Sequence, residues 1–343
     1  MVKLIVDLNN ILGGKVILIT GGTGFLGRSL IEEILKYNPQ SIRVFSRDEV
    51  KHHHIQQIFN NRKLRCLIGN VRDYHRLKRA MENVDIVIHA AALKRLDMIE
   101  YNVEEAIKTN ILGTLNVVNA CLECNVKKAV MVSTDKACAP VNTYGACKFV
   151  GERIFTESNY NKGPKDIIFT NVRYGNVLES TGSVIPFFEN KIKNNEPVPL
   201  TDPRMTRFII SPKQATELIF NALTYAIGGE IFIPQLPSFK IVDLIDILKE
   251  KHNSDVKTEI IGIRPGEKIH ELMVNEYEVP RTYEYRDFYV ITSSIHRYLT
   301  IKTAKYITEG KRLDEDIFKE YCSKDALISK KKIKELFEKL ELL

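Results

Sequence analysis

Residues 15–27, KVILITGGTGFLG, decide the fold of this chain. The first six form a short apolar run, which is typical of a buried parallel strand. Glycines then recur at three-residue intervals, and residues 28–37 form an amphipathic stretch that is typical of a helix. A glycine loop between a strand and a helix lets the backbone turn tightly and approach a pyrophosphate at the helix N-terminus. We therefore expect a dinucleotide to contact Gly21, Thr23, Gly24, Phe25, Leu26 and Gly27.

The next expected strand, residues 41–45, leads into Ser46, Arg47 and Asp48. An NAD site usually carries an acid here, about 20 residues past the glycines, for the ribose 2′-hydroxyl. A serine and an arginine suit a 2′-phosphate better, because a guanidinium binds phosphate in a fork. The alternative is that Arg47 is a solvated loop residue and Asp48 binds the ribose. The sequence thus favours NADP as cofactor, with NAD possible, and assigns Ser46 and Arg47 to its binding.

Strand and helix patterns continue to alternate after this unit. Apolar runs predict strands at residues 65–69, 84–89, 128–133 and 167–173, and a helical pattern covers 102–124. This alternation predicts an α/β fold, a Rossmann-like doubly wound parallel sheet with a smaller C-terminal substrate-binding lobe. Ligands of such a sheet lie beyond the carboxyl ends of its strands. The residues expected to border the dinucleotide there are Asn70, Val71, Ala90 and Ala91.

Composition excludes several classes of function. No window of the 343 residues approaches the ~18 apolar residues of a membrane span, and no signal peptide is apparent, so we expect a cytoplasmic protein without a membrane partner. The net charge is +7, but no arginine-rich arm with interleaved aromatics is present, so nucleic-acid binding is not favoured. Six scattered cysteines resemble cytosolic free thiols. Neither the Cys121 and Cys124 pair nor His52–His54 predicts a metal site.

Residues 134–148, TDKACAPVNTYGACK, hold the expected chemistry. Tyr144 and Lys148 share one helix face, because side chains at i and i+4 stack along the axis. There the ammonium can lower the pKa of the phenol and prepare it to accept a hydroxyl proton. Asp135 and Lys136 offer a second proton-transfer pair just upstream. One pair suits hydride chemistry, and two pairs indicate that an elimination follows the oxidation.

Eight blocks along the chain carry a family resemblance: GGTGxxG, SRDE, HAAALK, STDKA with P.N.YGA.K, VRYGNV, GSVIPFF, DPRMTRF and RPGEK. Together they resemble the extended short-chain dehydrogenase/reductase superfamily. Within it, they are similar to the soluble inverting UDP-N-acetylglucosamine 4,6-dehydratases of polysaccharide and flagellin-glycan biosynthesis. The similarity covers about residues 14–290. Asp135 with Lys136, the tyrosine at 144 and the missing membrane segment favour this type over deoxythymidine-diphosphoglucose dehydratases, simple 4-epimerases and membrane-anchored retaining dehydratases.

The resemblance implies a three-step reaction on a UDP-sugar. Tyr144 removes the proton of the 4-hydroxyl, hydride passes from carbon 4 to NADP⁺, and Thr134 hydrogen-bonds the forming ketone. Lys136 then takes the proton on carbon 5, and Asp135 protonates the departing 6-hydroxyl. The hydride returns to carbon 6 while Lys136 reprotonates carbon 5 from the opposite face. The implied product is a UDP-4-keto-6-deoxy-L-hexosamine.

This chemistry sets conditions on two pKa values. A lysine base has to be neutral and Asp135 has to hold a proton, against reference pKa values of about 10.4 and 3.9. Direct pairing of Asp135 with Lys136 would move both pKa values the wrong way. Because successive residues that leave a strand point apart, we expect the two side chains to stay separate until the sugar lies between them.

The resemblance also implies the substrate-binding residues and the division of the chain. Arg207 and Arg264 are expected at the diphosphate, Glu267 at the uridine ribose and Lys94 at the sugar. The residues implied for the pyrophosphate and uridine are Asn176, Ser183, Val184 and Pro186. We expect residues 1–175, with about 211–229, to form the NADP-binding Rossmann domain. Residues 176–210 and 230–343 then form the nucleotide-sugar-binding lobe and a C-terminal extension.

Three alternatives stay open at this point. The protein is an epimerase of nucleotide sugars, a dehydratase of another nucleoside-diphosphate hexose, or a non-catalytic NADP sensor. Such a sensor tends to lose the tyrosine and lysine pair, which is present here. Relatives assemble through helices that flank the active-site helix, so the resemblance also implies a homo-oligomer.

Overall fold

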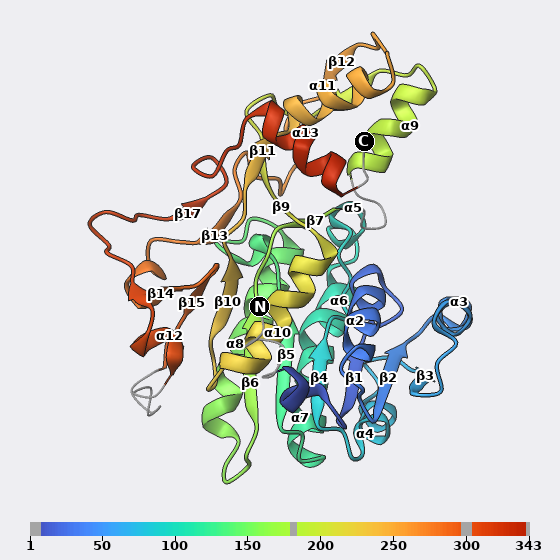
Figure 1. Ribbon diagram of the computed structural model, residues 1–343, viewed down its shortest axis with the longest axis vertical. Coiled ribbons are helices and arrows are strands. Elements are labelled where there is room, and N and C mark those ends of the chain that lie inside the picture. The colour runs from blue at the N-terminus through green and yellow to red at the C-terminus, as the bar shows by residue number, and fades with distance from the viewer. Residues whose placement is uncertain (1–7, 179–183, 296–303, 341–343) are drawn as a thin grey trace.

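The computed structural model describes residues 8–178, 184–295 and 304–340. Its main sheet contains β1 (Val16–Thr20), β2 (Ser41–Ser46), β3 (Leu64–Ile68), β4 (Ile86–His89), β5 (Lys128–Val132), β6 (Ile168–Val172), β10 (Ile231–Pro234), β14 (Thr282–Tyr285), β15 (Phe288–Ile291) and β16 (Lys311–Arg312). The ten strands follow the order β16-β14-β15-β10-β6-β5-β4-β1-β2-β3 (Figure 1). Strands β10 to β3 in this order are parallel, and β14, β15 and β16 are antiparallel. The predicted doubly wound sheet is confirmed, because β3-β2-β1-β4-β5-β6 is the order known from dinucleotide-binding domains.

Helices cover both faces of the sheet. On one face, α2 (Phe25–Leu35) packs against α10 (Pro212–Tyr225), and on the other, α4 (Tyr74–Met81), α7 (Gly113–Glu123) and α8 (Thr143–Asn161) pack together. Strand β1 contributes side chains to the hydrophobic cores on both faces of the sheet. Ile17 and Ile19 belong to the core under α2 and α10, and Val16 and Leu18 belong to the core under α4 and α7. Burial on two sides explains why β1, β4 and β5 read as nearly continuous apolar runs rather than as alternating patterns.

The helical pattern predicted at residues 102–124 is confirmed, with one irregularity. It comprises α6 (Val103–Ala106), a π-helical turn η1 (Ile107–Leu112) and α7. The start of α10 also agrees with the sequence, because Ser211 and Gln214 form a capping box and Pro212 occupies the first turn. The shorter elements of this half are α3 (Glu49–Phe59), α5 (Leu96–Ile99) and the 3₁₀ turn η2 (Asp135–Ala137).

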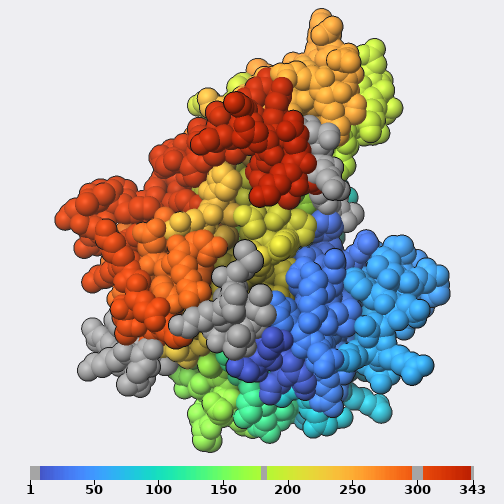
Figure 2. All heavy atoms as spheres, in the orientation of Figure 1, coloured from blue at the N-terminus to red at the C-terminus, as the bar shows by residue number. Residues whose placement is uncertain are grey.

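A smaller lobe stands above the carboxyl ends of the strands in Figure 1. It contains α9 (Val184–Lys193), β7 (Asn176–Val177), β8 (Val198–Leu200), β9 (Thr206–Ile210), β11 (Ser238–Lys240), α11 (Ile241–Lys251), β12 (Thr258–Ile260) and α13 (Lys330–Lys339). These elements share a core of their own, in which Phe188, Leu244 and Phe337 are almost fully buried. Helix α13, in red, packs beside α11, in orange, in Figure 2.

The main sheet continues past residue 230. Strand β10 pairs with β6 and carries β15 on its other edge, so part of the C-terminal region extends the sheet. The remaining elements are β13 (Leu272–Val274), η3 (Val279–Arg281), α12 (Lys305–Thr308) and β17 (Tyr321–Cys322). Because β13 pairs with β17, residues 321–322 lie beside residues 272–274, just after the RPGEK segment. The predicted domain boundaries stay a prediction.

Two observations concern membrane-spanning helices and disulfide bonds. Among the helices of the described residues, none is both long and apolar enough to cross a bilayer. All six cysteines are free thiols.

Candidate active site

The glycine loop after β1 has the shape that a pyrophosphate requires. Gly21 has a φ of +71°, and a Cβ there would lie 2.8 Å from the backbone of Ala91. A Cβ at Gly27 would lie 2.2 Å from the carbonyl oxygen of Gly22. Gly24 caps α2 without a side-chain hydrogen bond, and the first turn of α2 has no acidic residue. The first N–H groups of α2 therefore suit an anion.

The end of β2 presents polar groups to this loop. Ser46 Oγ lies 2.8 Å from Thr23 Oγ1 and 3.0 Å from His52 Nε2. Arg47 is exposed. The side chain of Asp48 caps α3 by accepting a hydrogen bond of 3.0 Å from the backbone N–H of Lys51. The acid considered as a ribose ligand thus serves as a helix cap.

Loops after β3 and β4 line the same end of the sheet. Val71 is buried, and Asn70 Oδ1 accepts a hydrogen bond from the N–H of Arg72. The backbone of Ala90 and Ala91 lies against Gly21, and the contact of both alanines with a dinucleotide stays a prediction. Lys94 lies at the end of the β4 loop and is exposed.

Tyr144 and Lys148 lie one turn apart at the start of α8, which Asn142 caps. Lys148 is 3% exposed, and its Nζ donates a hydrogen bond of 2.7 Å to the carbonyl oxygen of Val132. Burial lowers the pKa of Lys148 to about 8. Burial also raises the pKa of Tyr144 to about 12. The predicted lowering of the Tyr144 pKa is wrong, because desolvation of the phenolate dominates and the Lys148 ammonium is bound to a backbone carbonyl.

Asp135 and Lys136 form a direct ion pair. Lys136 Nζ lies 3.0 Å from Asp135 Oδ1, and the Asp135 side chain is fully buried. The predicted separation of these side chains is wrong. Both residues lie in the 3₁₀ turn η2, so the alternation of side chains along a strand does not apply. Thr134 caps this turn, and its hydroxyl donates a hydrogen bond of 2.8 Å to Asp135 Oδ1.

A second acid and an arginine reach the same amine. Glu271 Oε1 lies 3.4 Å from Lys136 Nζ and 3.6 Å from Arg207 Nε. Burial alone disfavours the ammonium, but Asp135 and Glu271 outweigh this effect and raise the pKa of Lys136. The guanidinium of Arg207 also donates to the carbonyl oxygens of Lys268 and Ile269. Arg207 is therefore brought to the Lys136 side, and its predicted contact with a diphosphate stays a prediction.

The RPGEK segment packs on the loop between η2 and α8. Asn142 Nδ2 donates a hydrogen bond of 2.7 Å to the carbonyl oxygen of Gly266. Arg264 is exposed, whereas Glu267 Oε2 is buried and has no hydrogen-bond partner among the described residues. The structure thus brings the segment predicted for the nucleotide to the loop that follows the predicted catalytic residues Asp135 and Lys136.

The other predicted substrate residues lie on the lobe. Asn176 is exposed in β7, which pairs with β9, the strand that carries Arg207. Val184 and Pro186 begin α9, and Pro186 is exposed. Ser183 lies outside the described residues.

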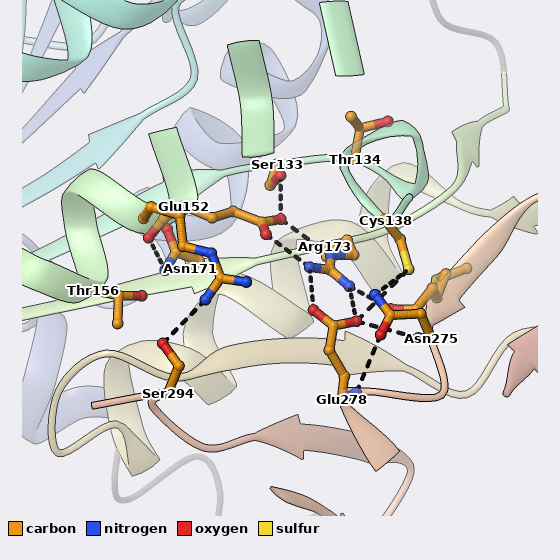
Figure 3. Close-up of polar contacts among 12 residues, drawn as sticks. Ser133, Thr134, Cys138, Glu152, Thr156, Asn171, Arg173, Asn275, Glu278 and Ser294 are labelled. Atoms are coloured by element: carbon orange, nitrogen blue, oxygen red, sulfur yellow. Dashed lines mark hydrogen bonds and ion pairs between the residues drawn. The ribbon is translucent and has the colours of Figure 1, made fainter. Parts of the chain in front are cut away.

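A buried ionic network supports the site from below (Figure 3). Arg173, at the end of β6, is fully buried and donates hydrogen bonds to both carboxylate oxygens of Glu152 and of Glu278. Ser133 Oγ donates a hydrogen bond of 2.6 Å to Glu152 Oε1. Because Glu152 belongs to α8 and Ser133 precedes Thr134, the network fixes the helix and the loop that carry the predicted catalytic residues.

Comparison with known proteins agrees with this geometry. The family model described as "Polysaccharide biosynthesis protein" matches residues 17–293, which include the glycine loop, the catalytic loop and the RPGEK segment. The chain belongs to this polysaccharide biosynthesis family.

Three relatives show what the chain is similar to, and two of them are named as enzymes that act on nucleotide sugars. The inverting UDP-N-acetylglucosamine 4,6-dehydratase of Campylobacter jejuni is 46% identical over 284 residues, 82% of this chain and 84% of the relative. An uncharacterized membrane protein of Methanocaldococcus jannaschii is 41% identical over 345 residues, 98% of this chain and 99% of the relative. The UDP-glucose 4-epimerase of Rickettsia massiliae is 38% identical over 302 residues, 87% and 88% of the two chains.

A solved structure confirms the fold of this family member. Pen from Bacillus thuringiensis superposes with a TM-score of 0.89 at 39% identity, and the match covers 97% of this chain and 99% of that chain.

Sequence reasoning missed several residues that hold the candidate site in place. Asn110 of η1 exchanges two hydrogen bonds with the backbone of Leu93 and so fixes the loop after β4. Its signal was a polar residue inside an apolar helical pattern. Glu152, Glu271 and Glu278 gave no local signal, because their partners come from distant parts of the chain.

Proposed function

We propose that this protein is an inverting UDP-N-acetylglucosamine 4,6-dehydratase that also epimerises carbon 5 and releases a UDP-4-keto-6-deoxy-L-hexosamine. The observation that carries the proposal is the ion pair of the buried Asp135 with the partly buried Lys136, beside Tyr144. It occurs in a chain that is 46% identical to a dehydratase of that name. An amine, an acid and a phenol in one site supply the groups that an oxidation followed by an elimination of water requires.

The residues of the chain account for the proton movements. Tyr144, in its phenolate form, accepts the proton of the 4-hydroxyl, and Thr134 hydrogen-bonds the oxygen that becomes the ketone. Lys136 removes the proton from carbon 5, which the ketone makes acidic, and Asp135 protonates the leaving 6-hydroxyl. Lys136 then returns a proton to the opposite face of carbon 5. This change of face makes the reaction inverting.

The ion pair can be converted into the form that the reaction needs by moving one proton. Transfer from Lys136 Nζ to Asp135 Oδ1, along their 3.0 Å contact, gives a neutral amine base and a neutral acid. No outside proton donor is required. Asp135 loses one proton to the leaving water, and Tyr144 gains one proton from the 4-hydroxyl. Thr134 hydrogen-bonds both Asp135 and Tyr144, so it can relay the proton from Tyr144 back to Asp135. The proton balance over one turnover is therefore closed.

Unpartnered buried oxygens support a polyhydroxyl substrate. Asp135 Oδ2, Glu267 Oε2 and Glu271 Oε2 are buried without a hydrogen-bond partner within the described ranges. Leaving such acceptors unsatisfied costs about 1–3 kcal/mol each, so they call for donors from a ligand. Hydroxyl groups of a hexose and a ribose are donors of the required kind.

The proposed cofactor is NADP, held by the glycine loop, Ser46 and Arg47. It supplies reversible two-electron redox chemistry at the sugar when bound. The preference over NAD is supported by Asp48, whose carboxylate caps α3, and by Ser46, which hydrogen-bonds Thr23 and His52. Mass spectrometry of the dinucleotide released from purified protein tests the choice. Arg47→Asp should weaken NADP binding about 10-fold or more, whereas Arg62→Asp, an exposed control, should not.

The decisive experiment is a product assay without added cofactor. Purified protein is incubated with UDP-N-acetylglucosamine in deuterium oxide, and the product is examined by mass spectrometry and NMR. We expect loss of water and deuterium at carbon 5. A product of unchanged mass apart from deuterium would refute dehydration.

The second candidate function is 4-epimerisation, because relatives at 38% identity bear that name. A 4-epimerase eliminates no water and therefore needs no acid and amine pair. The presence of Asp135 and Lys136 thus favours dehydration over epimerisation. Formation of a 4-epimer with the 6-hydroxyl retained would establish it.

Two further properties belong to the proposal. A cytoplasmic location is supported by six free cysteines, since disulfides are rare in reducing compartments. A homo-oligomeric state is supported by exposed apolar side chains along residues 98–115, including Met98 on α5, Val103 on α6 and Ile107 on η1.

A further inference from the structure

Lys136 is held by two acids that come from different parts of the chain. Asp135 Oδ1 and Glu271 Oε1 lie 3.0 and 3.4 Å from its Nζ, and the two acidic side chains are 0% and 3% exposed. Each acid keeps its other oxygen buried and without a hydrogen-bond partner in the described part of the chain. The proposed reaction uses Asp135 and Lys136 but assigns nothing to Glu271.

The charges around the amine are balanced. The groups that face Lys136 are Asp135 in the same turn, Glu271 before β13, Arg207 on β9 and Tyr144 on α8. Arg207 Nε lies 3.6 Å from Glu271 Oε1. Two carboxylates and two cations share this buried space, so loss of either acid would leave excess positive charge and disfavour the protonated amine.

The C-terminal segment fixes Glu271 and its surroundings. Ser323, next to β17, is fully buried and accepts a hydrogen bond of 2.9 Å from the N–H of Glu271. Its own N–H donates one of 2.9 Å to the carbonyl oxygen of Glu271. The Ser323 hydroxyl also hydrogen-bonds Thr206, the neighbour of Arg207. Residues beyond the matched motifs therefore fix the position of both groups that flank Lys136.

We propose that Glu271 is a positioning residue that acts through Lys136: its carboxylate holds the amine against Asp135 and sets the pH range in which the pair carries one proton. The proposal rests on the proposed dehydratase function. When Asp135 and Lys136 both hold a proton, Lys136 cannot act as a base. When neither holds one, Asp135 cannot act as an acid, so only the form with one proton on the pair reacts. A third, negatively charged group beside the pair favours protonation in both steps.

The pH dependence of the reaction follows from this role. Removing the charge of Glu271 should lower both apparent pKa values of the pair and move the whole active range toward acid. We expect Glu271→Gln to shift both limbs of the pH–kcat profile downward by about one unit or more. A merely structural role would lower kcat at every pH and leave the limbs in place.

The test compares matched variants of the full-length protein. The pH dependence of dehydration is measured for wild type, Glu271→Gln, Glu271→Asp and Glu276→Gln, an exposed control near β13. Solvent deuterium exchange at carbon 5 of the 4-keto product is measured alongside, because it needs Lys136 but no oxidation at carbon 4. We expect Glu271→Asp to keep the wild-type limbs with a lower kcat and Glu276→Gln to match wild type. Unmoved limbs in Glu271→Gln would overturn the proposal.

A stability measurement keeps this inference separate from the proposed function. Absence of any water loss by wild type refutes the dehydratase but leaves the electrostatic coupling testable. In urea unfolding, Glu271→Gln and Lys136→Met should shift the midpoint non-additively, because each removes a charge that the other faces. Additive shifts would overturn the role of Glu271 whatever the reaction is.

Discussion

Lys136 carries its charge in a place where the reaction needs a neutral amine. Its 3.0 Å contact with Asp135 makes the neutral form accessible by a single proton transfer. Lys136→Met keeps most of the side-chain volume and removes the base. Because a positioned general base contributes about 10²–10⁴-fold, we expect kcat for dehydration to fall at least about 100-fold. Deuterium incorporation at carbon 5, measured by NMR in deuterium oxide, should disappear.

The matched control for this variant is Lys127→Met. Lys127 is exposed just before β5, at the opposite end of that strand from Asp135, and its Nζ lies 3.6 Å from Asp166 Oδ2. Normal deuterium incorporation by Lys136→Met would assign the base to another residue.

Burial of the Lys148 ammonium lowers the stability of the fold, although the proposed reaction uses this residue. Burial lowers its pKa from 10.5 to about 8, which corresponds to a destabilisation of about 3 kcal/mol below pH 8, at ~1.4 kcal/mol per unit. Lys148→Met removes this destabilisation but loses the hydrogen bond to Val132, worth about 1 kcal/mol. We therefore expect the variant to be inactive and about 2 kcal/mol more stable at pH 7. The measurement is the free energy of urea unfolding.

The pH dependence of this difference gives a second check. Between pH 8 and 10.5 the folded wild type loses the Lys148 proton while the unfolded chain keeps it, so the unfolded state binds more protons. Wild-type stability then rises relative to Lys148→Met across this window. A constant difference across this range would show that the stability change has another cause.

At the scale of elements, Arg173 joins β6, α8 and the segment before β14. It donates to Glu152 and Glu278 in a space without solvent. Removing one partner of a buried pair costs about 3–5 kcal/mol, because an uncompensated charge stays behind. We expect Glu278→Ala to lower the free energy of unfolding by about that amount. Glu276→Ala, an exposed neighbour, should cost less than about 0.5 kcal/mol in the same urea titration.

An effect of Glu278→Ala below 1 kcal/mol would mean that Glu152 alone neutralises Arg173. The same variant should lower kcat, since the network fixes α8 and the loop after β5. Far-UV circular dichroism separates this loss from general unfolding.

A helix or strand could be predicted where its own residues carry a pattern, and contacts between distant parts of the chain could not. Strands β1, β4 and β5 are buried on both sides, so their apolar runs are nearly continuous and the sequence predicts each to within a few residues. The short strands β14, with the sequence TYEY, and β16, with the sequence KR, give no such run. The separation expected for Asp135 and Lys136 was wrong because a 3₁₀ turn replaces the strand there. Glu271 could not be predicted, since Ser323 and Arg207 reach it only through the tertiary fold.

At the scale of the whole molecule, the site lies between two cores. The sheet delivers the glycine loop and η2 at its carboxyl edge, and the lobe contributes Arg207 and the RPGEK segment. The return of β17 to β13 links the end of the chain to the same place. The chemistry therefore depends on segments from most of the sequence, although the motifs that predict it are short.

One apolar surface has no role within a single chain. Val103, Ile107, Leu112 and Leu115 are exposed, at fractions between 37% and 48%, along α6, η1 and α7. Their spacings of four, five and three residues follow one helix face, because the π-helical turn accommodates the spacing of five. Such a stripe is typical of an interface between subunits.

We expect this surface to join copies of the chain through hydrophobic burial. Replacing both Ile107 and Leu112 with glutamate would place charges in that interface and should shift light-scattering mass toward the monomer. Ile317→Glu is the matched control, because Ile317 is 83% exposed and lies near the other end of the chain. An unchanged mass for the double variant would exclude these helices as the interface. A monomeric wild type would exclude the oligomer itself, since the stripe would then be exposed in solution without a partner.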